Sequence, residues 1–108
     1  MLYPNVETFI GCDSSYRAAS IVLYGAPYDS TTSYRPGARF GPSAIRHESY
    51  GLETYSLFFD RDITDNAVHD AGDLEIPFGD TVKALSIIEE YADELFAAGK
   101  KPLMIGGE

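Results

Sequence analysis

Three arginines stand close together in a polar stretch of the first half of the chain: Arg35, Arg39 and Arg46. A guanidinium group can bind a carboxylate through two parallel hydrogen bonds. Each of the three could therefore hold an acidic partner, across the loop or across a subunit boundary. We favour an ion pair inside the protein over a contact to a substrate.

A row of hydroxyl side chains, residues 30–33, lies in the same stretch. Nucleophilic catalysis is not predicted from them, because the chain has no G-x-S-x-G motif and no histidine placed to act as a base. Loop hydroxyls usually satisfy backbone groups instead. We therefore predict no catalytic residue in this chain. The side chains that we expect to line the mouth of a substrate pocket are Asp29, Ser33, Tyr34 and Arg35.

The two histidines of the chain are the first candidates for metal ligands. His47 lies beside Arg46, whose positive charge makes it a poor place to bind a dication. His69 precedes Asp70 and could form a site with it and with Asp73. We favour core packing for His69 and loop capping for the two carboxylates. We therefore predict no metal ligand in this chain.

The polar stretch follows an apolar run, Ile21–Gly25, which is rich in β-branched residues and predicted to be a strand. No polar residue alternates through it, so both of its faces should be covered, as in a parallel sheet. The loop after it, residues 29–41, is longer than the ~2–6 residues usual in α/β units. Loops at this end of a parallel strand commonly hold ligands. A nucleotide site is excluded, because neither G-x-G-x-x-G nor G-K-[ST] is present.

Two further apolar runs are predicted strands, near Val68–Ala71 and Leu103–Ile105. With helices between the three strands, the order predicts parallel βαβ units with right-handed crossovers. We expect Ile21–Gly25 to be the central strand, with one of the other two on each side. Between the first two strands, residues 52–60 receive no firm assignment and residues 61–66 are predicted to form a charged turn.

Two helices connect these strands. The first begins at Gly41-Pro42, where proline suits the first turn. The second spans about Thr81–Ala98 after the N-cap Asp80. We expect its core face to be one apolar stripe, made of Val82, Leu85, Ile88, Ala92 and Leu95. Between strand and helix, at least one of Gly37 and Gly41 should have a positive φ or let another backbone approach closely.

Composition excludes several classes of protein. The chain has 108 residues, at most one domain, and a net charge of −9, which argues against a nucleic-acid partner. The field of an acidic protein is compatible with a cationic substrate. The single cysteine allows no intrachain disulfide. The amino terminus shows neither a signal peptide nor a membrane span, so we expect a cytoplasmic protein without membrane contact.

Three segments carry a family resemblance. The pattern G-A-P-Y-D-S-T-T-S-Y-R-P-G-A-R-F-G-P-S-A-I-R, Gly25 to Arg46, resembles the first signature region of the ureohydrolases, the arginase/agmatinase family, and is most similar to the agmatinases. The D-A-G-D of residues 70–73 resembles the D-x-G-D that ends the family's second strand. Residues 102–108 look like the third strand leading into the family's G-G-x-H.

The resemblance implies an α/β protein with a three-layer αβα arginase-like fold. This chain would hold its first three parallel strands: an arm at residues 1–19 and the first βαβαβ unit at residues 20–108. The sequence stops directly after a buried strand, at Glu108, so we expect a truncated, amino-terminal part of one larger domain.

The resemblance also implies a function for the full-length protein. It would be a metal-dependent hydrolase that converts agmatine to putrescine and urea at a dinuclear manganese site, with two Mn²⁺ per subunit of a homo-oligomer. The metal ligands of such enzymes come from later segments, so we expect these 108 residues alone to be inactive and to bind no manganese. Three alternatives stay open: a different guanidino substrate, such as guanidinobutyrate or arginine; a non-catalytic fragment; and a free-standing small α/β binding domain, which conflicts with the abrupt end.

Overall fold

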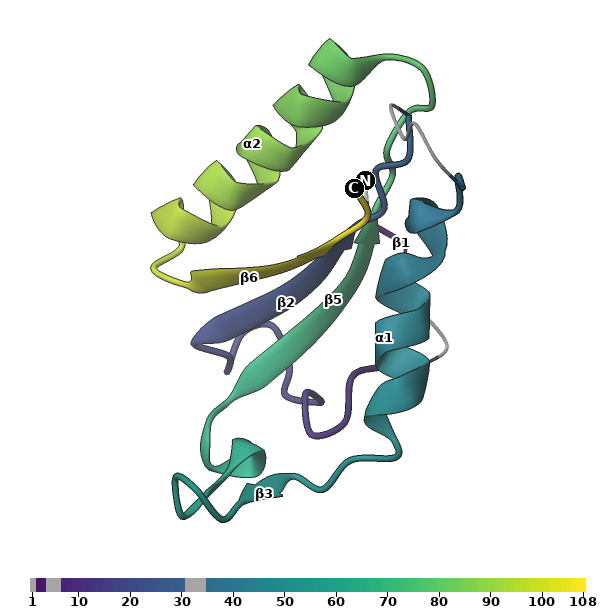
Figure 1. The fold of residues 1–108 in the computed structure, drawn as a ribbon. Helices are drawn as coiled ribbons and strands as arrows, with labels where there is room; N and C mark the ends of the chain where they lie inside the picture. The colour runs from purple at the N-terminus through teal and green to yellow at the C-terminus, as the bar shows by residue number, and fades with distance from the viewer. Residues whose placement is uncertain (1, 4–6, 31–34) are drawn as a thin grey trace.

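The computed structural model describes residues 2–3, 7–30 and 35–108 (Figure 1). Its strands and helices form one four-stranded main sheet with a helix on each side, and a separate two-stranded sheet. In chain order they are β1 (Leu2–Tyr3), β2 (Ile21–Ala26), a 3-10 helix (Ala38–Phe40), α1 (Gly41–Ser49), β3 (Tyr55–Ser56), β4 (Arg61–Asp62), a second 3-10 helix (Ile63–Asp65), β5 (Val68–Leu74), α2 (Thr81–Ala97) and β6 (Lys101–Gly106).

The main sheet has the strand order β1-β5-β2-β6. Strand β2 pairs in parallel with β5 on one side and with β6 on the other, so that Leu23 lies between Asp70 and Leu103. The prediction of a parallel sheet with the first apolar run at its centre is confirmed. The short strand β1 adds an antiparallel pairing along β5, which the sequence pattern did not indicate.

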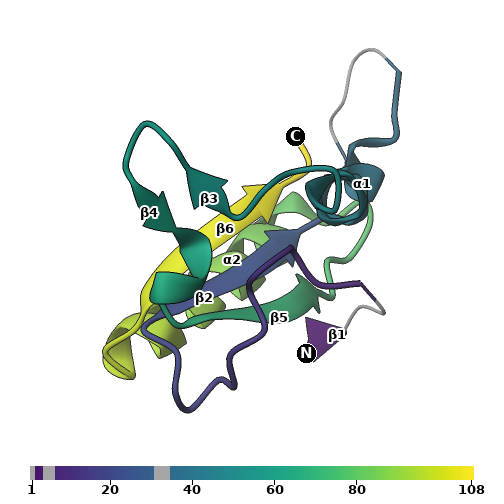
Figure 2. The same cartoon turned by 90° about the horizontal axis from the view of Figure 1, so that it is seen from below.

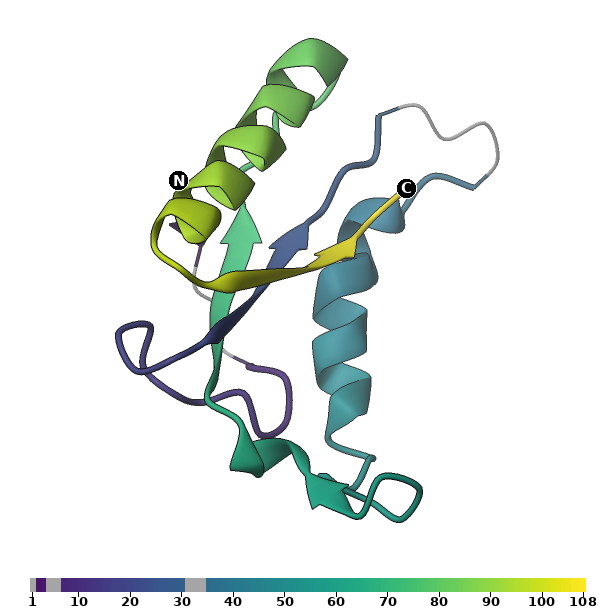
Figure 3. The same ribbon diagram turned by 90° about the vertical axis from the view of Figure 1, so that its left-hand side faces the viewer.

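The two helices cover opposite faces of this sheet (Figure 3). Side chains of β2 alternate between the faces, because successive residues of a strand point to opposite sides. Val22 and Tyr24 pack under α2 with Tyr91 and Leu95. Leu23 points to the other face, where Cys12, Val68 and the partly buried Ile63 surround it. Both faces of β2 are therefore apolar and covered, as the unbroken run of apolar residues predicts.

The predicted core face of α2 is partly wrong. The helix begins where expected, with the Asp80 side chain accepting a hydrogen bond from the Lys83 N–H at 3.0 Å. However, Val82 is 78% exposed and Leu85 is 56% exposed. The residues buried on the helix are Ala84, Tyr91 and Leu95, with Ile87 and Ile88 partly buried beside them. Tyr91 is decisive, because its ring packs edge-on against Tyr24 with 4.9 Å between the centroids and so fixes the helix rotation.

The turn between the β2 loop and α1 behaves as predicted. Gly37 has φ of 136°, a value that residues with a side chain rarely adopt. A Cβ on Gly41 would stand 3.1 Å from the carbonyl oxygen of Gly106, so the start of α1 approaches the end of β6 closely. Pro42 lies in the first turn of α1, is fully buried and needs no donor there. The glycine prediction is thus confirmed at both positions.

The segment between α1 and β5 forms a small hairpin, which projects from the body of the molecule (Figure 2). Strands β3 and β4 pair antiparallel, and Leu57 and Phe58 at the turn between them are each 89% exposed. The predicted charged turn after it is instead β4 followed by a 3-10 helix, closed by a capping box between Asp62 and Asp65. No helix in the described ranges is long and apolar enough to cross a membrane.

Candidate functional site

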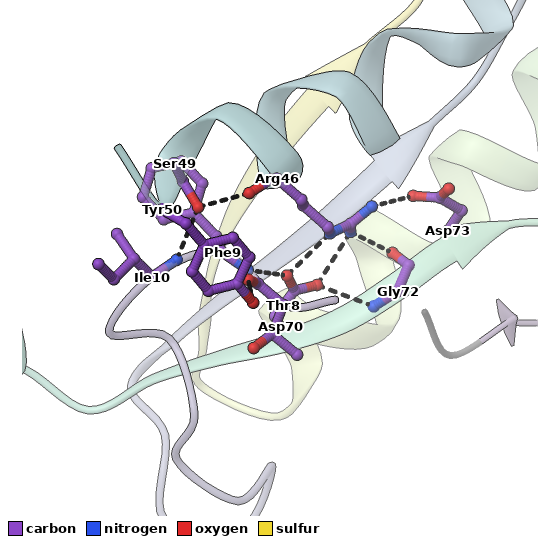
Figure 4. Close-up of polar contacts among 9 residues, drawn as sticks. All are labelled: Thr8, Phe9, Ile10, Arg46, Ser49, Tyr50, Asp70, Gly72 and Asp73. Atoms are coloured by element: carbon purple, nitrogen blue, oxygen red, sulfur yellow. Dashed lines mark hydrogen bonds and ion pairs between the residues drawn. The ribbon is translucent and has the colours of Figure 1, made fainter. Parts of the chain in front are cut away.

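The most buried polar cluster joins α1 to the carboxyl end of β5 (Figure 4). Arg46 binds Asp70 bidentately, with Nε to Oδ2 at 2.8 Å and Nη2 to Oδ1 at 2.9 Å. Its Nη1 donates to Oδ1 of Asp73 at 2.6 Å, and Nη2 also reaches the carbonyl oxygen of Gly72 at 3.1 Å. The side chains of Arg46 and Asp70 are each 1% exposed. The interpretation of Arg46 as an internal ion pair is confirmed.

Asp70 holds the amino-terminal arm as well as the helix. Its carboxylate accepts the Phe9 N–H at 2.8 Å and the Gly72 N–H at 3.0 Å, in addition to the two bonds from Arg46. Burial alone would raise the pKa of Asp70, but these hydrogen bonds and the Arg46 charge outweigh it, so the pKa lies below its ordinary value of 3.8. The same bonds overcome the effect of burial on Arg46 and raise its pKa. Both groups are therefore held in their charged forms.

This cluster argues against a metal site formed by His69, Asp70 and Asp73, which was considered from the sequence. Both carboxylates are directed to Arg46, whose charge would repel a dication. His69 lies on the other face of β5 from Asp70, and its Nδ1 is 2.8 Å from the carbonyl oxygen of Ser14. Among the described residues there is no group of three or more His, Cys, Asp or Glu side chains that could hold a metal ion. These residues therefore do not fit a dinuclear manganese centre.

The second polar cluster fixes the loop after β2. Asp29 is 6% exposed, and its Oδ2 accepts the Gly37 N–H at 2.9 Å and Nη1 of Arg39 at 2.7 Å. Asp29 therefore binds both the far side of its own loop and the first turn of the 3-10 helix. Arg39 is half-exposed and lies over the Phe40 ring, 4.5 Å from its centroid. The ion-pair interpretation of Arg39 is confirmed as well.

The four residues predicted to line a pocket mouth differ in where the structure places them. Asp29 follows the carboxyl end of β2, where the prediction places it, but its side chain is buried. Arg35 is exposed and has φ of 51°, in the left-handed region. Ser33 and Tyr34 lie outside the described residues. That these side chains contact a substrate stays a prediction.

The carboxyl ends of β2, β6 and the start of α2 come together at one edge of the sheet. The Tyr28 hydroxyl is 2.8 Å from Oγ1 of Thr81, and the Gly79 N–H donates to Oγ of Ser30 at 3.2 Å. Glu108 lies two residues beyond the end of β6, and its Oε1 accepts the Ser30 N–H at 3.0 Å. Sequence reasoning missed Glu108, although a carboxylate that follows Gly-Gly at a strand end is a visible signal.

An apolar cavity of about 330 Å³ lies on the α1 face of the sheet. Its lining includes Phe9, Cys12, Leu23, Ile63 and Leu103 and has no charged side chain. Burial, with smaller effects from Asp70 and Asp13, raises the pKa of the Cys12 thiol to about 11, so this thiol is neutral at pH 7. A guanidinium ion would find no counter-ion there, so the cavity is not a candidate substrate site.

Comparison with known proteins places the chain among the ureohydrolases. The arginase family matches residues 19–108. The agmatinase of Bacillus subtilis strain 168 is 49% identical over 94% of this chain and 35% of its own length. An N(1)-aminopropylagmatine ureohydrolase of Thermococcus kodakarensis is 42% identical over 83% of the chain and 32% of its own length. The crystal structure of an agmatine ureohydrolase of Thermoplasma volcanium superposes with a TM-score of 0.89 at 30% identity, over 96% of this chain and 35% of that one.

The chain therefore spans about a third of the length of these relatives, and it corresponds to their amino-terminal portion. The matched region includes both polar clusters, because it begins before β2 and continues through β6.

Proposed function

The chain belongs to the arginase family, and from that premise we propose that the full-length protein is an agmatinase, which hydrolyses agmatine to urea and putrescine. The observation that carries this proposal is the 49% identity to the Bacillus subtilis agmatinase over 94% of the chain. The region that matches the family, residues 19–108, contains the R-P-G-A-R-F-G-P segment and the side chains of Arg46, Asp70 and Asp73. A role in polyamine biosynthesis follows from the product, putrescine.

The charge of the chain supports a cationic substrate. Agmatine carries a guanidinium and an ammonium group, and a protein segment with a net charge of −9 attracts such an ion over long range. The carboxyl edge of the sheet, where the β2 loop and Glu108 lie together, is the part of an α/β fold where ligands bind.

A second candidate is a longer guanidino compound. The Thermococcus kodakarensis relative is named for N(1)-aminopropylagmatine, and it is 42% identical over 83% of the chain. Arginine and guanidinobutyrate, which carry a carboxylate, are further candidates. A non-catalytic role for a chain of this length is the candidate from another class.

Family membership implies a pair of manganese ions for the full-length protein. The described residues do not supply ligands for them, since Asp70 and Asp73 bind Arg46. We propose that these ligands belong to other parts of the full-length protein. The Arg46 and Asp29 clusters would then stabilise the part of the sheet described here. We further propose a cytoplasmic homo-oligomer.

The test is urea release by the purified full-length protein, supplied with Mn²⁺. We expect kcat/KM to be highest for agmatine among four compounds: agmatine, N(1)-aminopropylagmatine, arginine and guanidinobutyrate. A higher value for N(1)-aminopropylagmatine would favour the second candidate. Absence of urea from all four compounds, in a protein shown to be folded and to contain manganese, would overturn the proposal.

A further inference from the structure

The two residues after β6 continue along the loop that leaves β2. The Gly107 N–H donates to the carbonyl oxygen of Ala26 at 3.1 Å, and the Glu108 N–H donates to that of Tyr28 at 3.0 Å. The backbones approach so closely that a Cβ on Gly107 would overlap the Tyr28 carbonyl oxygen. Residues 107–108 and 26–28 therefore form one joined unit at the carboxyl edge of the sheet.

Glu108 extends this unit with its side chain. Its Oε1 accepts the Ser30 N–H at 3.0 Å, so Glu108 binds the loop through both its backbone and its carboxylate. The Ser30 hydroxyl in turn accepts the Gly79 N–H, next to the start of α2. The carboxylate thus fixes the point at which the loop leaves the sheet.

Asp29 fixes the same loop from the protein side, through Gly37 and Arg39. Two acidic residues from distant parts of the sequence therefore fix neighbouring positions of the loop. The Asp29 side chain fixes position 29, and the Glu108 carboxylate fixes Ser30. The Ser30–Glu108 bond is the exposed one of the two contacts. A solvent-exposed hydrogen bond contributes little to stability, because water can replace either partner. Its position beside the loop therefore indicates a role other than stability.

We infer that Glu108 is a positioning residue for substrate binding: its carboxylate, bound to the Ser30 N–H, holds the Tyr28–Ser30 segment in the conformation that receives the guanidino substrate. This inference rests on the proposed function. Glu108 acts through the loop and not by pairing with the substrate's charge. The distinction can be measured, because the acceptor oxygen and the negative charge can be removed separately.

Three variants of the full-length protein separate these roles. Glu108→Ala removes the acceptor and the charge, whereas Glu108→Gln keeps an acceptor oxygen and removes only the charge. Glu89→Ala removes the same charge from an exposed position on α2 and is the control for long-range attraction. We expect KM for agmatine to rise about fivefold in Glu108→Ala with kcat nearly unchanged, and to stay near the wild-type value in the other two.

Hydrogen exchange of the Ser30 amide gives a readout that does not depend on catalysis. We expect this amide to exchange about fivefold faster in Glu108→Ala and at nearly the wild-type rate in Glu108→Gln and Glu89→Ala. Unchanged exchange in Glu108→Ala would overturn the positioning role. Faster exchange with an unchanged KM would overturn its link to the substrate.

Equal rises of KM in Glu108→Ala and Glu108→Gln would also contradict the inference, because the charge itself would then be responsible. A wild-type protein that releases no urea from any guanidino compound would overturn the proposed function instead, and the substrate part of this inference with it. The exchange experiment would still decide whether Glu108 holds the loop.

Discussion

Asp73 leaves no room for a side chain at Gly25. The Oδ1 of Asp73, which accepts Nη1 of Arg46 at 2.6 Å, occupies the space that a Cβ on Gly25 would need. A Cβ on Gly25 would also lie 2.9 Å from Cβ of Pro42 in α1. A glycine is therefore required at position 25, because Asp73 of β5 and Pro42 of α1 leave no space for a side chain.

Gly25→Ala should lower the free energy of unfolding by about 2 kcal/mol or more, because the methyl group must displace a carboxylate bound to a buried arginine. The measurement is urea denaturation of the purified protein. Gly51→Ala is the control, since a Cβ there would stand 3.5 Å from the Glu48 carbonyl oxygen in ordinary contact. Similar losses from both substitutions would contradict the steric explanation.

Arg46→Met should cost about 3–5 kcal/mol, because it leaves the buried Asp70 without its counter-ion while keeping most of the side-chain volume. Arg61→Met changes an exposed arginine on β4 and should stay within about 0.5 kcal/mol of the wild type. Denaturant unfolding of both variants at pH 7 provides the comparison. An Arg46→Met protein as stable as Arg61→Met would show that the cluster contributes little.

Stability should fall in acid through Asp70. Its pKa is lower in the folded protein than its ordinary 3.8, so the folded state binds this proton less tightly than the unfolded state. The contribution is present above the unfolded pKa and is lost as the pH falls through the lower folded value. Unfolding free energies measured from pH 7 down to pH 2 should show this loss, with a smaller pH dependence in Asp70→Asn. Asp93→Asn, on the exposed side of α2, should retain the wild-type dependence.

Leu95 and Leu85 test which face of α2 is buried in the 108-residue chain. Leu95 is 0% exposed and Leu85 is 56% exposed. Leu95→Ala should cost about 2–5 kcal/mol, whereas Leu85→Ala should cost well under half as much. Thermal unfolding of the two variants gives the answer. Comparable losses from the two substitutions would instead support the stripe that the sequence pattern predicts, in which both leucines are buried.

The 108-residue chain alone should release no urea from agmatine and retain no stoichiometric manganese. A dinuclear site needs several carboxylate and imidazole ligands around ions ~3.5–4 Å apart, and the described residues offer no such group. Metal analysis after dialysis against Mn²⁺, with a urea assay, tests this. Two manganese ions per chain together with urea release would refute it, and the full-length protein is the positive control.

Sequence reasoning was most successful where one local signal was sufficient. The apolar run of β2, the Asp80 cap of α2 and the Gly37 turn each depend on neighbouring residues, and each is confirmed. The rotation of α2 could not be predicted in the same way, because Tyr91 and the small Ala84 decide it through contacts with the sheet. Strands β3 and β4 have two residues each, too few for an alternating pattern.

Only one side of each polar cluster could be predicted from the sequence. Arginines that bind carboxylates were expected, but the partners of Arg46 lie 24 and 27 residues away, and only the pairing of β2 with β5 brings them under α1. The contact between Ser30 and Glu108 spans 78 residues and depends on β6 lying beside β2. Such partners follow from strand order and not from any local pattern.

The central place of β2 in the sheet has a consequence for synthesis on the ribosome. Its residue Ala26 pairs with Gly106, which is made 106 − 26 = 80 residues later. At the usual rate of about 5–20 residues per second, one edge of β2 waits roughly 4–16 s for its partner strand. An apolar strand with an open edge readily pairs with other chains. The nascent protein should therefore be most prone to aggregation before β6 emerges, and depletion of ribosome-associated chaperones should lower its soluble yield.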